Sequence, residues 1–283
     1  MDDKTDRARR RPEADAADAA EFVAIESGGR DYRIEYAWVG PETGAPPVVF
    51  LHEGLGSRSM WRDFPEALCR AGGFRGLVYS RPGYGWSTPR PAAEHWPVDF
   101  MHRQAEDVLP AVLDALGLAD TPLWLFGHSD GASIALLAAA AWPKRVAGLI
   151  LLAPHVFVEE LSLTNIRAAR EAYVGGDLRS RLVRYHADPD SAFWGWNDIW
   201  LAPEFRAWDI GDAATAVRAP ILAVQGLDDP YGTMAHVERI AAKAPTPVEL
   251  LPLENCGHSP HRDHAQAVIA AATAFIRRFA PAP

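Results

Sequence analysis

Short apolar runs that alternate with longer helical stretches constrain the fold of this chain more than any other feature. Six runs rich in aliphatic, β-branched and aromatic residues have the length of buried strands: 47–51, 76–80, 123–126, 146–153, 220–225 and 247–253. Continuous apolar strands separated by helices are typical of a parallel sheet covered on both faces. The sequence therefore predicts an α/β fold with a mostly parallel central sheet and helices on both faces.

The segments between these runs predict the helices and the division of the chain. Helical patterns extend over residues 59–71, 99–116, 132–141, 234–242 and 264–279. Residues 22–25 and 33–38 are expected to form an antiparallel hairpin at the sheet edge. The alternation breaks between 155 and 212, which we interpret as a lid inserted after the sixth strand, so that 21–154 and 213–283 form the core. Residues 1–20 mix charges with alanine and predict a disordered tail.

Composition narrows the partners and the location. The 283 residues suffice for one large α/β domain with a small insertion, and the formal charge of −9 disfavours nucleic acid and anionic membranes as partners. No window holds eighteen uninterrupted apolar residues, and no secretory signal begins the chain. Cys69 and Cys256 match no metal-ligand spacing, and two buried free thiols suggest a reducing compartment. A cytoplasmic protein without a membrane span is expected.

Residues 127–131 read Gly-His-Ser-Asp-Gly and fit the G-x-S-x-G turn that exposes a nucleophilic serine. In such a turn a strand passes sharply into a helix, and glycines are needed where the two backbones cross. The pentapeptide alone is weak evidence. However, Ser129 follows the apolar strand 123–126 and opens the helix 132–141, which is the context that the motif requires. Ser129 is therefore the candidate nucleophile.

A serine hydroxyl needs a general base, and the base needs an orienting carboxylate. The strand 220–225 runs into a turn that carries Asp228 and Asp229, and His258 follows the last strand. These groups emerge at the carboxyl ends of parallel strands, as Ser129 does, and ligand sites lie at that edge of open α/β sheets. His258 is thus the candidate base, with one of the two aspartates as its partner.

These motifs resemble the α/β-hydrolase superfamily, and the resemblance covers residues 22–280. The turn 80–87 is similar to the family's glycine-rich turn after the fourth strand. In the family the acid usually stands three residues after a glycine, which implies Asp229 rather than Asp228. The loop 52–56 resembles the family's oxyanion loop, which implies that an N–H of Gly54 or Leu55, together with the N–H of Asp130, binds the substrate oxygen. Glu53 departs from the glycine common there, and its side chain is expected to turn away.

The pocket is harder to predict from sequence. The lid carries a cluster of tryptophans, whose rigid apolar surface suits hydrophobic acyl or aryl groups. Trp194 and Trp196 are candidates for the pocket, whereas Trp200 and Trp208 are expected to pack within the lid. His155, at the end of the sixth strand, either lines the pocket or begins the lid. His261 and His264 are expected to be polar residues at a helix start and not metal ligands.

Together, these expectations indicate a serine hydrolase that cleaves a small or medium carboxylic ester through an acyl-enzyme intermediate. Ser129, His258 and Asp229 would form the triad, with a hydrophobic small molecule as substrate and no cofactor. Three alternatives remain open: a C–C bond hydrolase of ring-cleavage products, a peptidase similar to proline iminopeptidases, and a ligand receptor on the same fold. The peptidase would need acidic lid residues such as Glu159, Glu160 or Glu171. The sequence does not decide the oligomeric state.

Overall fold

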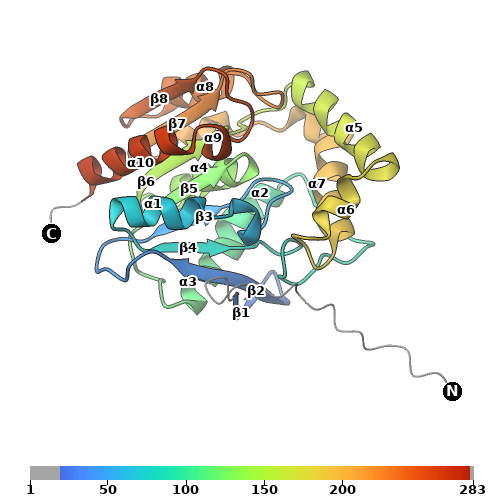
Figure 1. The fold of residues 1–283 in the computed structure, drawn as a ribbon, viewed down its shortest axis with the longest axis horizontal. Helices are drawn as coiled ribbons and strands as arrows, with labels where there is room; N and C mark the ends of the chain where they lie inside the picture. The colour runs from blue at the N-terminus through green and yellow to red at the C-terminus, as the bar shows by residue number, and fades with distance from the viewer. Residues whose placement is uncertain (1–19, 281–283) are drawn as a thin grey trace.

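A computed structural model describes residues 20–280, and its centre is one eight-stranded sheet with the strand order β1-β2-β4-β3-β5-β6-β7-β8 (Figure 1). The strands are β1 (Glu21–Ser27), β2 (Arg30–Val39), β3 (Val48–Leu51), β4 (Gly76–Tyr79), β5 (Leu123–His128), β6 (Val146–Leu152), β7 (Ile221–Gly226) and β8 (Val248–Leu253). The expected disordered tail lies, apart from residue 20, outside the described residues.

The sheet is parallel from β4 through β3 and β5 to β8, and antiparallel where β1 pairs with β2 and β2 with β4. The expected fold class and the edge hairpin are therefore confirmed. The six predicted core strands agree with β3 to β8 within two residues at each end. Because these strands are parallel, their carboxyl ends share one edge of the sheet, and every candidate catalytic side chain follows such an end.

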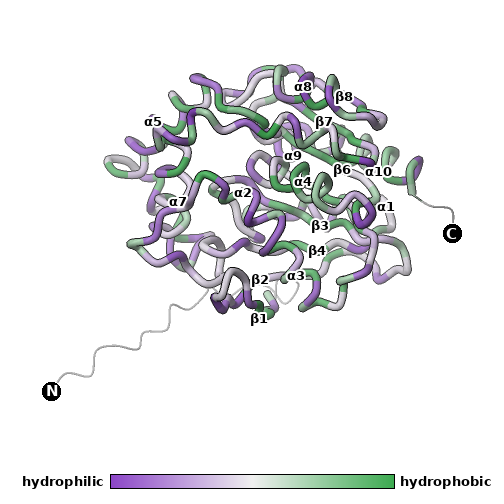
Figure 2. The backbone as a smooth tube through the Cα atoms, turned by 180° about the vertical axis from the view of Figure 1, so that it is seen from behind, coloured by the Kyte–Doolittle hydropathy of each residue, from purple (hydrophilic) through white to green (hydrophobic). Residues whose placement is uncertain are grey.

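Helices cover both faces of the sheet. On one face lie α1 (Phe64–Gly72) and α10 (Ala265–Phe279), which contact each other. The other face is covered by α2 (Phe100–Arg103), α3 (Leu109–Ala115), α4 (Asp130–Ala141) and α8 (Ala235–Lys243). The two faces hold separate apolar clusters, and Figure 2 shows hydrophobic stretches of the chain along the central strands.

Two helices begin or continue differently from the prediction because of proline. Residues 59–71 form a short 3₁₀ turn, η2 (Arg58–Trp61), and then α1, in whose first turn Pro65 lies. Residues 99–116 form no continuous α-helix, because a π-helical turn, η3 (Gln104–Val108), separates α2 from α3. Pro110 follows this turn and has no N–H to donate, so the regular hydrogen-bond ladder cannot pass through it.

Three helices stand between β6 and β7 and lie together beyond the strands in Figure 1: α5 (Glu160–Gly175), α6 (Leu178–Leu182) and α7 (Pro189–Leu201). We call α5 to α7 the helical insertion. The 3₁₀ turns η4 (Pro203–Ala207) and η5 (Gly211–Ala216) lead back to the sheet, and the short α9 (Pro260–Asp263) precedes α10. None of the helices in the described chain combines the length and apolarity needed to span a bilayer. Cys69 and Cys256 are buried free thiols, as predicted.

Candidate active site

The strand-to-helix turn between β5 and α4 holds Ser129 in a conformation that few residues adopt. Its φ of 54° and ψ of −120° lie outside the ordinary regions for L-residues. The flanking glycines follow from contact distances. A Cβ at Gly127 would lie 2.3 Å from the carbonyl oxygen of Gly131, and one at Gly131 would lie 2.0 Å from that of Leu51. Only glycine allows β5, α4 and the end of β3 to approach so closely.

Three side chains from distant parts of the chain form one hydrogen-bonded series. His258 Nε2 lies 2.9 Å from Ser129 Oγ, and His258 Nδ1 lies 2.8 and 2.9 Å from the two carboxylate oxygens of Asp229. Since the carboxylate accepts, Nδ1 carries the proton and Nε2 is left to accept from the serine hydroxyl. The structure thus brings together the three residues that the sequence singled out.

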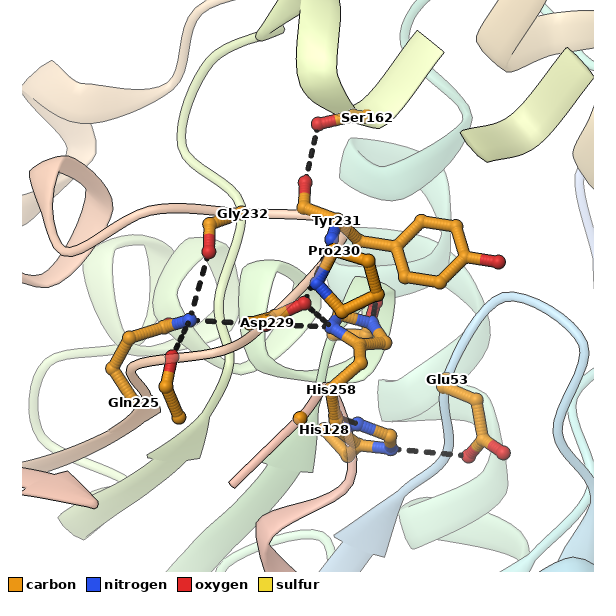
Figure 3. Close-up of polar contacts among 12 residues, drawn as sticks. Glu53, His128, Ser162, Gln225, Asp229, Pro230, Tyr231, Gly232 and His258 are labelled. Atoms are coloured by element: carbon orange, nitrogen blue, oxygen red, sulfur yellow. Dashed lines mark hydrogen bonds and ion pairs between the residues drawn. The ribbon is translucent and has the colours of Figure 1, made fainter. Parts of the chain in front are cut away.

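Asp229 is fixed at the end of β7 by further donors (Figure 3). Its carboxylate accepts from the backbone N–H of Tyr231 at 2.8 Å and from Gln225 Nε2 at 2.9 Å. Burial raises the pKa of Asp229, but the hydrogen bonds from His258, Tyr231 and Gln225 outweigh burial and hold the pKa below its ordinary value. Asp228, in contrast, is exposed. Asp229 is therefore an ionised partner for His258.

His128, inside the turn, connects Glu53 to the backbone of His258 (Figure 3). Its Nε2 donates to the His258 carbonyl oxygen at 2.6 Å, and its Nδ1 lies 3.4 Å from Glu53 Oε2. Arg262 approaches the other carboxylate oxygen of Glu53 at 3.8 Å. Burial raises the pKa of Glu53, yet the hydrogen bond with His128 and the charge of Arg262 hold it well below the usual range. The Glu53 carboxylate is thus paired with basic groups, although its side chain still borders the cavity.

The loop after β3 is held by buried side chains. Arg81 Nη2 donates to the Glu53 carbonyl oxygen at 2.9 Å. His186, which precedes α7, accepts from the Gly85 N–H at 2.9 Å and donates through Nε2 to the Leu55 carbonyl at 3.1 Å. Burial lowers the pKa of His186 to about 4, so the ring is neutral and can fill both roles. These contacts fix the carbonyls of the loop while its N–H groups stay available.

Three N–H groups remain the candidates for an oxyanion hole. The loop N–H groups of Gly54 and Leu55 and the N–H of Asp130, at the first position of α4, find no acceptor among the described residues. A Cβ at Gly54 would lie 2.2 Å from Trp196 Cδ1, so the loop packs directly on α7. The predicted oxyanion residues therefore lie where β3, α4 and α7 meet.

A cavity of about 200 Å³ opens onto Ser129 and His258. The other lining residues are Glu53, Leu55, His128, Asp130, His155, Ser162, Ile166, Trp196, Trp200, Tyr231 and Ser259. Among residues 20–280, two carboxylates thus border this cavity, whereas no lysine or arginine does. The volume suits a small group, and the aromatic and aliphatic walls suit an apolar one.

The predictions for the pocket are right for some residues of α7 and wrong for others. Trp196 and His155 line the cavity, as expected, but Trp194 does not. Trp194 lies instead against Tyr173 and beneath the Arg170 guanidinium, 5.2 Å from its ring centre. Residues two apart on a helix point about 200° apart, whereas residues four apart share a face. Trp200, expected only to pack, therefore joins Trp196 in the wall, and this spacing was a signal that the sequence contained.

Other features of the site were not predicted from the sequence. Tyr231, Ser162 and Ile166 line the cavity without any sequence motif to identify them, although Tyr231 closely follows Asp229. His261 lies at the start of α9, as predicted, but it is buried. Both of its ring nitrogens lack hydrogen-bond partners within residues 20–280, and the rings of Trp61 and His128 lie 4.8 Å from its ring. Over residues 20–280, no group of three or more His, Cys, Asp or Glu side chains is arranged to hold a metal ion.

Comparison with known proteins agrees with this fold and site. A family model described as the alpha/beta hydrolase fold matches residues 46–193, more than half of the chain. The chain therefore belongs to the alpha/beta hydrolase fold family, and it is a hydrolase.

Individual proteins are similar to this chain at low sequence identity. The chain is 27% identical to "2-hydroxy-6-oxononadienedioate/2-hydroxy-6-oxononatrienedioate hydrolase 2" of Pseudomonas putida, over 88% of this chain and 93% of the relative. It is 25% identical to the hydrolase named for the same compounds from Cupriavidus pinatubonensis, over 89% and 93%. Among solved structures, a thermophilic esterase from Thermogutta terrifontis superposes with a TM-score of 0.72 at 20% identity, covering 93% of this chain and all of that one. This last likeness concerns the fold alone.

Proposed function

We propose that the protein hydrolyses a carboxylic ester with a small or medium acyl group, through an acyl-enzyme intermediate on Ser129. The observation that carries the proposal is the continuous hydrogen-bonded series from Ser129 through His258 to Asp229 at the wall of an apolar cavity. A serine next to a correctly oriented imidazole is the arrangement that makes a hydroxyl nucleophilic.

The reaction proceeds in two balanced halves. Ser129 Oγ forms a bond to the ester carbonyl carbon while its proton passes to His258 Nε2. The tetrahedral intermediate collapses, the ester C–O bond breaks, and His258 gives the proton to the departing alcohol. Water then attacks the acyl-enzyme, with His258 again taking a proton, and the carboxylic acid leaves as Ser129 regains its hydrogen. Asp229 holds the imidazole in the required tautomer and stabilises its charged form.

In both halves the carbonyl oxygen becomes an anion. The N–H groups of Leu55 or Gly54 and of Asp130 are suited to bind it, because they lack acceptors and because Asp130 opens α4, whose N-terminus carries a partial positive charge. We also propose that the helical insertion serves as the lid, since Trp196 and Trp200 of α7 form one wall of the cavity.

The names of the two curated relatives suggest C–C bond hydrolysis of ring-cleavage products as the second candidate. Those named compounds are dioates and carry two carboxylate groups. In the described part of the chain, the carboxylates of Glu53 and Asp130 border the cavity, and no lysine or arginine does. A dianion would gain no partner in such a cavity and would be repelled by it. This charge pattern favours an uncharged or cationic ester.

The peptidase alternative depended on acidic residues of the lid. Glu159 lies 2.8 Å from His236, and Glu160 lies 2.9 Å from Arg167. Neither of them, nor Glu171, borders the cavity. The receptor alternative requires a site that binds without turnover, and it is separated from an enzyme by the experiment that follows.

The test is hydrolysis of p-nitrophenyl acetate and butyrate by the wild type and by Ser129→Ala, with a ring-cleavage dienoate as the competing substrate. The wild type should turn over the aryl esters in preference to the dienoate, and Ser129→Ala should lose a factor of about 10⁴ or more. Equal thermal unfolding of the two proteins is the control for folding. Full activity in Ser129→Ala would refute the nucleophile, and labelling of Ser129 by a fluorophosphonate without any turnover would favour the receptor.

A further inference from the structure

The side chain of Asp130 is a buried carboxylate beside the nucleophile, with one oxygen unused. The residue is fully buried at the start of α4 and also borders the cavity. Its Oδ1 accepts from Trp200 Nε1 at 3.2 Å, whereas its Oδ2 has no hydrogen-bond partner among the residues that the structure describes. Oδ2 faces the loop after β3, since a Cβ at Gly54 would lie 3.1 Å from it and 2.2 Å from Trp196 Cδ1. An unpaired acceptor is thus set between the oxyanion loop and the cavity wall.

The charges around Asp130 leave its carboxylate incompletely compensated. Burial raises the pKa of Asp130 to about 6, although the charge of Arg81 and the hydrogen bond from Trp200 oppose this effect. The carboxylate makes no hydrogen bond to Arg81, whose Nη2 is directed to the carbonyl oxygen of Glu53. Leaving a buried charged acceptor unpaired is costly, and a ligand that donates to it would recover that cost.

Of the two carboxylates that border the cavity, only Asp130 is without a basic partner in hydrogen-bond contact. Glu53 lies 3.4 Å from His128 and 3.8 Å from Arg262, so its carboxylate already has basic groups of the protein beside it. The aromatic rings of Trp196, Trp200 and Tyr231 surround the same space. Carboxylate and aromatic faces together are the groups that proteins use to bind an ammonium ion.

We propose that Asp130 binds an ammonium group of the substrate, and that the preferred substrates are esters whose acyl part carries a protonated amine next to the carbonyl. This inference rests on the proposed ester hydrolysis at Ser129 and names the substrate class of that site. Covalent geometry supports the α position: an α-nitrogen lies about 2.5 Å from the carbonyl carbon, and the Cα atoms of Ser129 and Asp130 are about 3.8 Å apart. An amine at the end of a long acyl chain would instead lie among the apolar walls of the cavity.

The test uses benzyl esters of alanine, lactic acid and propionic acid, which share the alcohol and differ at the α-carbon in an ammonium, a hydroxyl or a hydrogen. At pH 7 the wild type should show a kcat/KM for the alanine ester at least tenfold above those of both others. In Asp130→Asn this ratio should fall to about one, with the larger change in KM. The matched control is Glu53→Gln, in which the ratio should stay within twofold of the wild type.

The outcomes separate this inference from the proposed function. A wild type that hydrolyses all three esters equally well would overturn the ammonium site while leaving ester hydrolysis intact. If no ester is turned over, the ester proposal fails, and binding of the same esters to Ser129→Ala, measured by calorimetry, decides the site. Tighter binding of the alanine ester by tenfold or more supports it, and equal affinities overturn it.

The ratio should also depend on pH in a way that a merely structural Asp130 would not produce. It should fall below about pH 6, as Asp130 takes up a proton, and above the pKa of the substrate amine, about 7.7–8.0. The groups that face Asp130 are Arg81, Glu53, His128 and Tyr84. Glu53 stays ionised in this range and Tyr84 stays neutral, since burial raises the Tyr84 pKa to about 12.

Discussion

Replacing Asp229 by asparagine tests the orienting carboxylate with almost no change in shape. The two carboxylate oxygens accept from three donors: His258 Nδ1 at 2.8 and 2.9 Å, the Tyr231 N–H at 2.8 Å and Gln225 Nε2 at 2.9 Å. An asparagine keeps one oxygen, so its NH₂ group must face either the Tyr231 N–H or the Gln225 amide, and His258 loses its charged partner. In other triads the same change lowers kcat by about 10⁴, because the imidazole adopts the wrong tautomer.

The stability cost follows from the same contacts. Hydrogen bonds to a charged group contribute about 1.5–3 kcal/mol each. In Asp229→Asn one such bond is lost, and the new NH₂ group faces another N–H donor. The free energy of unfolding should therefore fall by about 2–3 kcal/mol. Folding lowers the pKa of Asp229 below its unfolded value of about 3.9. The difference in unfolding free energy between the wild type and Asp229→Asn is therefore largest at pH 7. It disappears as the pH falls from the unfolded pKa through the lowered pKa of the folded state. Urea unfolding at pH 7 and at about pH 3, below the unfolded value, measures this trend.

The neighbouring carboxylate supplies the control. Asp228 is exposed, so Asp228→Asn should keep kcat within twofold and stability within about 0.5 kcal/mol. Steady-state kinetics with p-nitrophenyl butyrate measure both variants. If Asp228→Asn lost activity while Asp229→Asn retained more than a tenth of it, the assignment of the acid and the reasoning from its hydrogen bonds would be refuted.

Three further substitutions and one control variant test the packing behind the site. Gly131→Ala should destabilise the protein by about 3 kcal/mol in urea unfolding, whereas Gly175→Ala, where a Cβ meets open space, should be neutral or slightly stabilising. His128→Phe should lower kcat about tenfold at an unchanged KM, since it removes the donor to the His258 carbonyl; an unaffected kcat would contradict this role. His261→Phe should raise the unfolding free energy by about 1 kcal/mol, because both nitrogens it removes are buried without partners.

The sheet could be predicted closely because its signal is local. A strand buried on both faces must be a short continuous apolar run, and β3 to β7 are buried along almost all of their length. The edge strand β8 is only partly buried and includes Glu249. The helix ends were less predictable, since Pro65 and Pro110 reset the backbone in ways that hydrophobic periodicity does not record. The start of α7 did carry a signal, because Asp188 caps it by accepting from two N–H groups and Pro189 follows at the first position.

The triad could be predicted because strand order and a strained turn place its members, whereas the pocket depends on side-chain direction within the helical insertion. Trp194 and Trp196 are equivalent in composition, yet the helical turn directs only Trp196 to the cavity. Likewise, the motif identifies Asp130 by its backbone N–H, but nothing local in the sequence shows that its carboxylate is buried against Trp200.

Asp130 illustrates why catalysis and selectivity are coupled in this turn. Its N–H is suited to an oxyanion, yet a carboxylate a few bonds away opposes the same developing charge. An ammonium next to the carbonyl would neutralise that carboxylate and add its own positive charge near the oxyanion. Asp130 would therefore favour the reaction of such substrates alone. A neutral ester would meet the carboxylate uncompensated. The arrangement therefore implies selectivity expressed in the transition state as well as in binding, because the charge that it compensates is largest there.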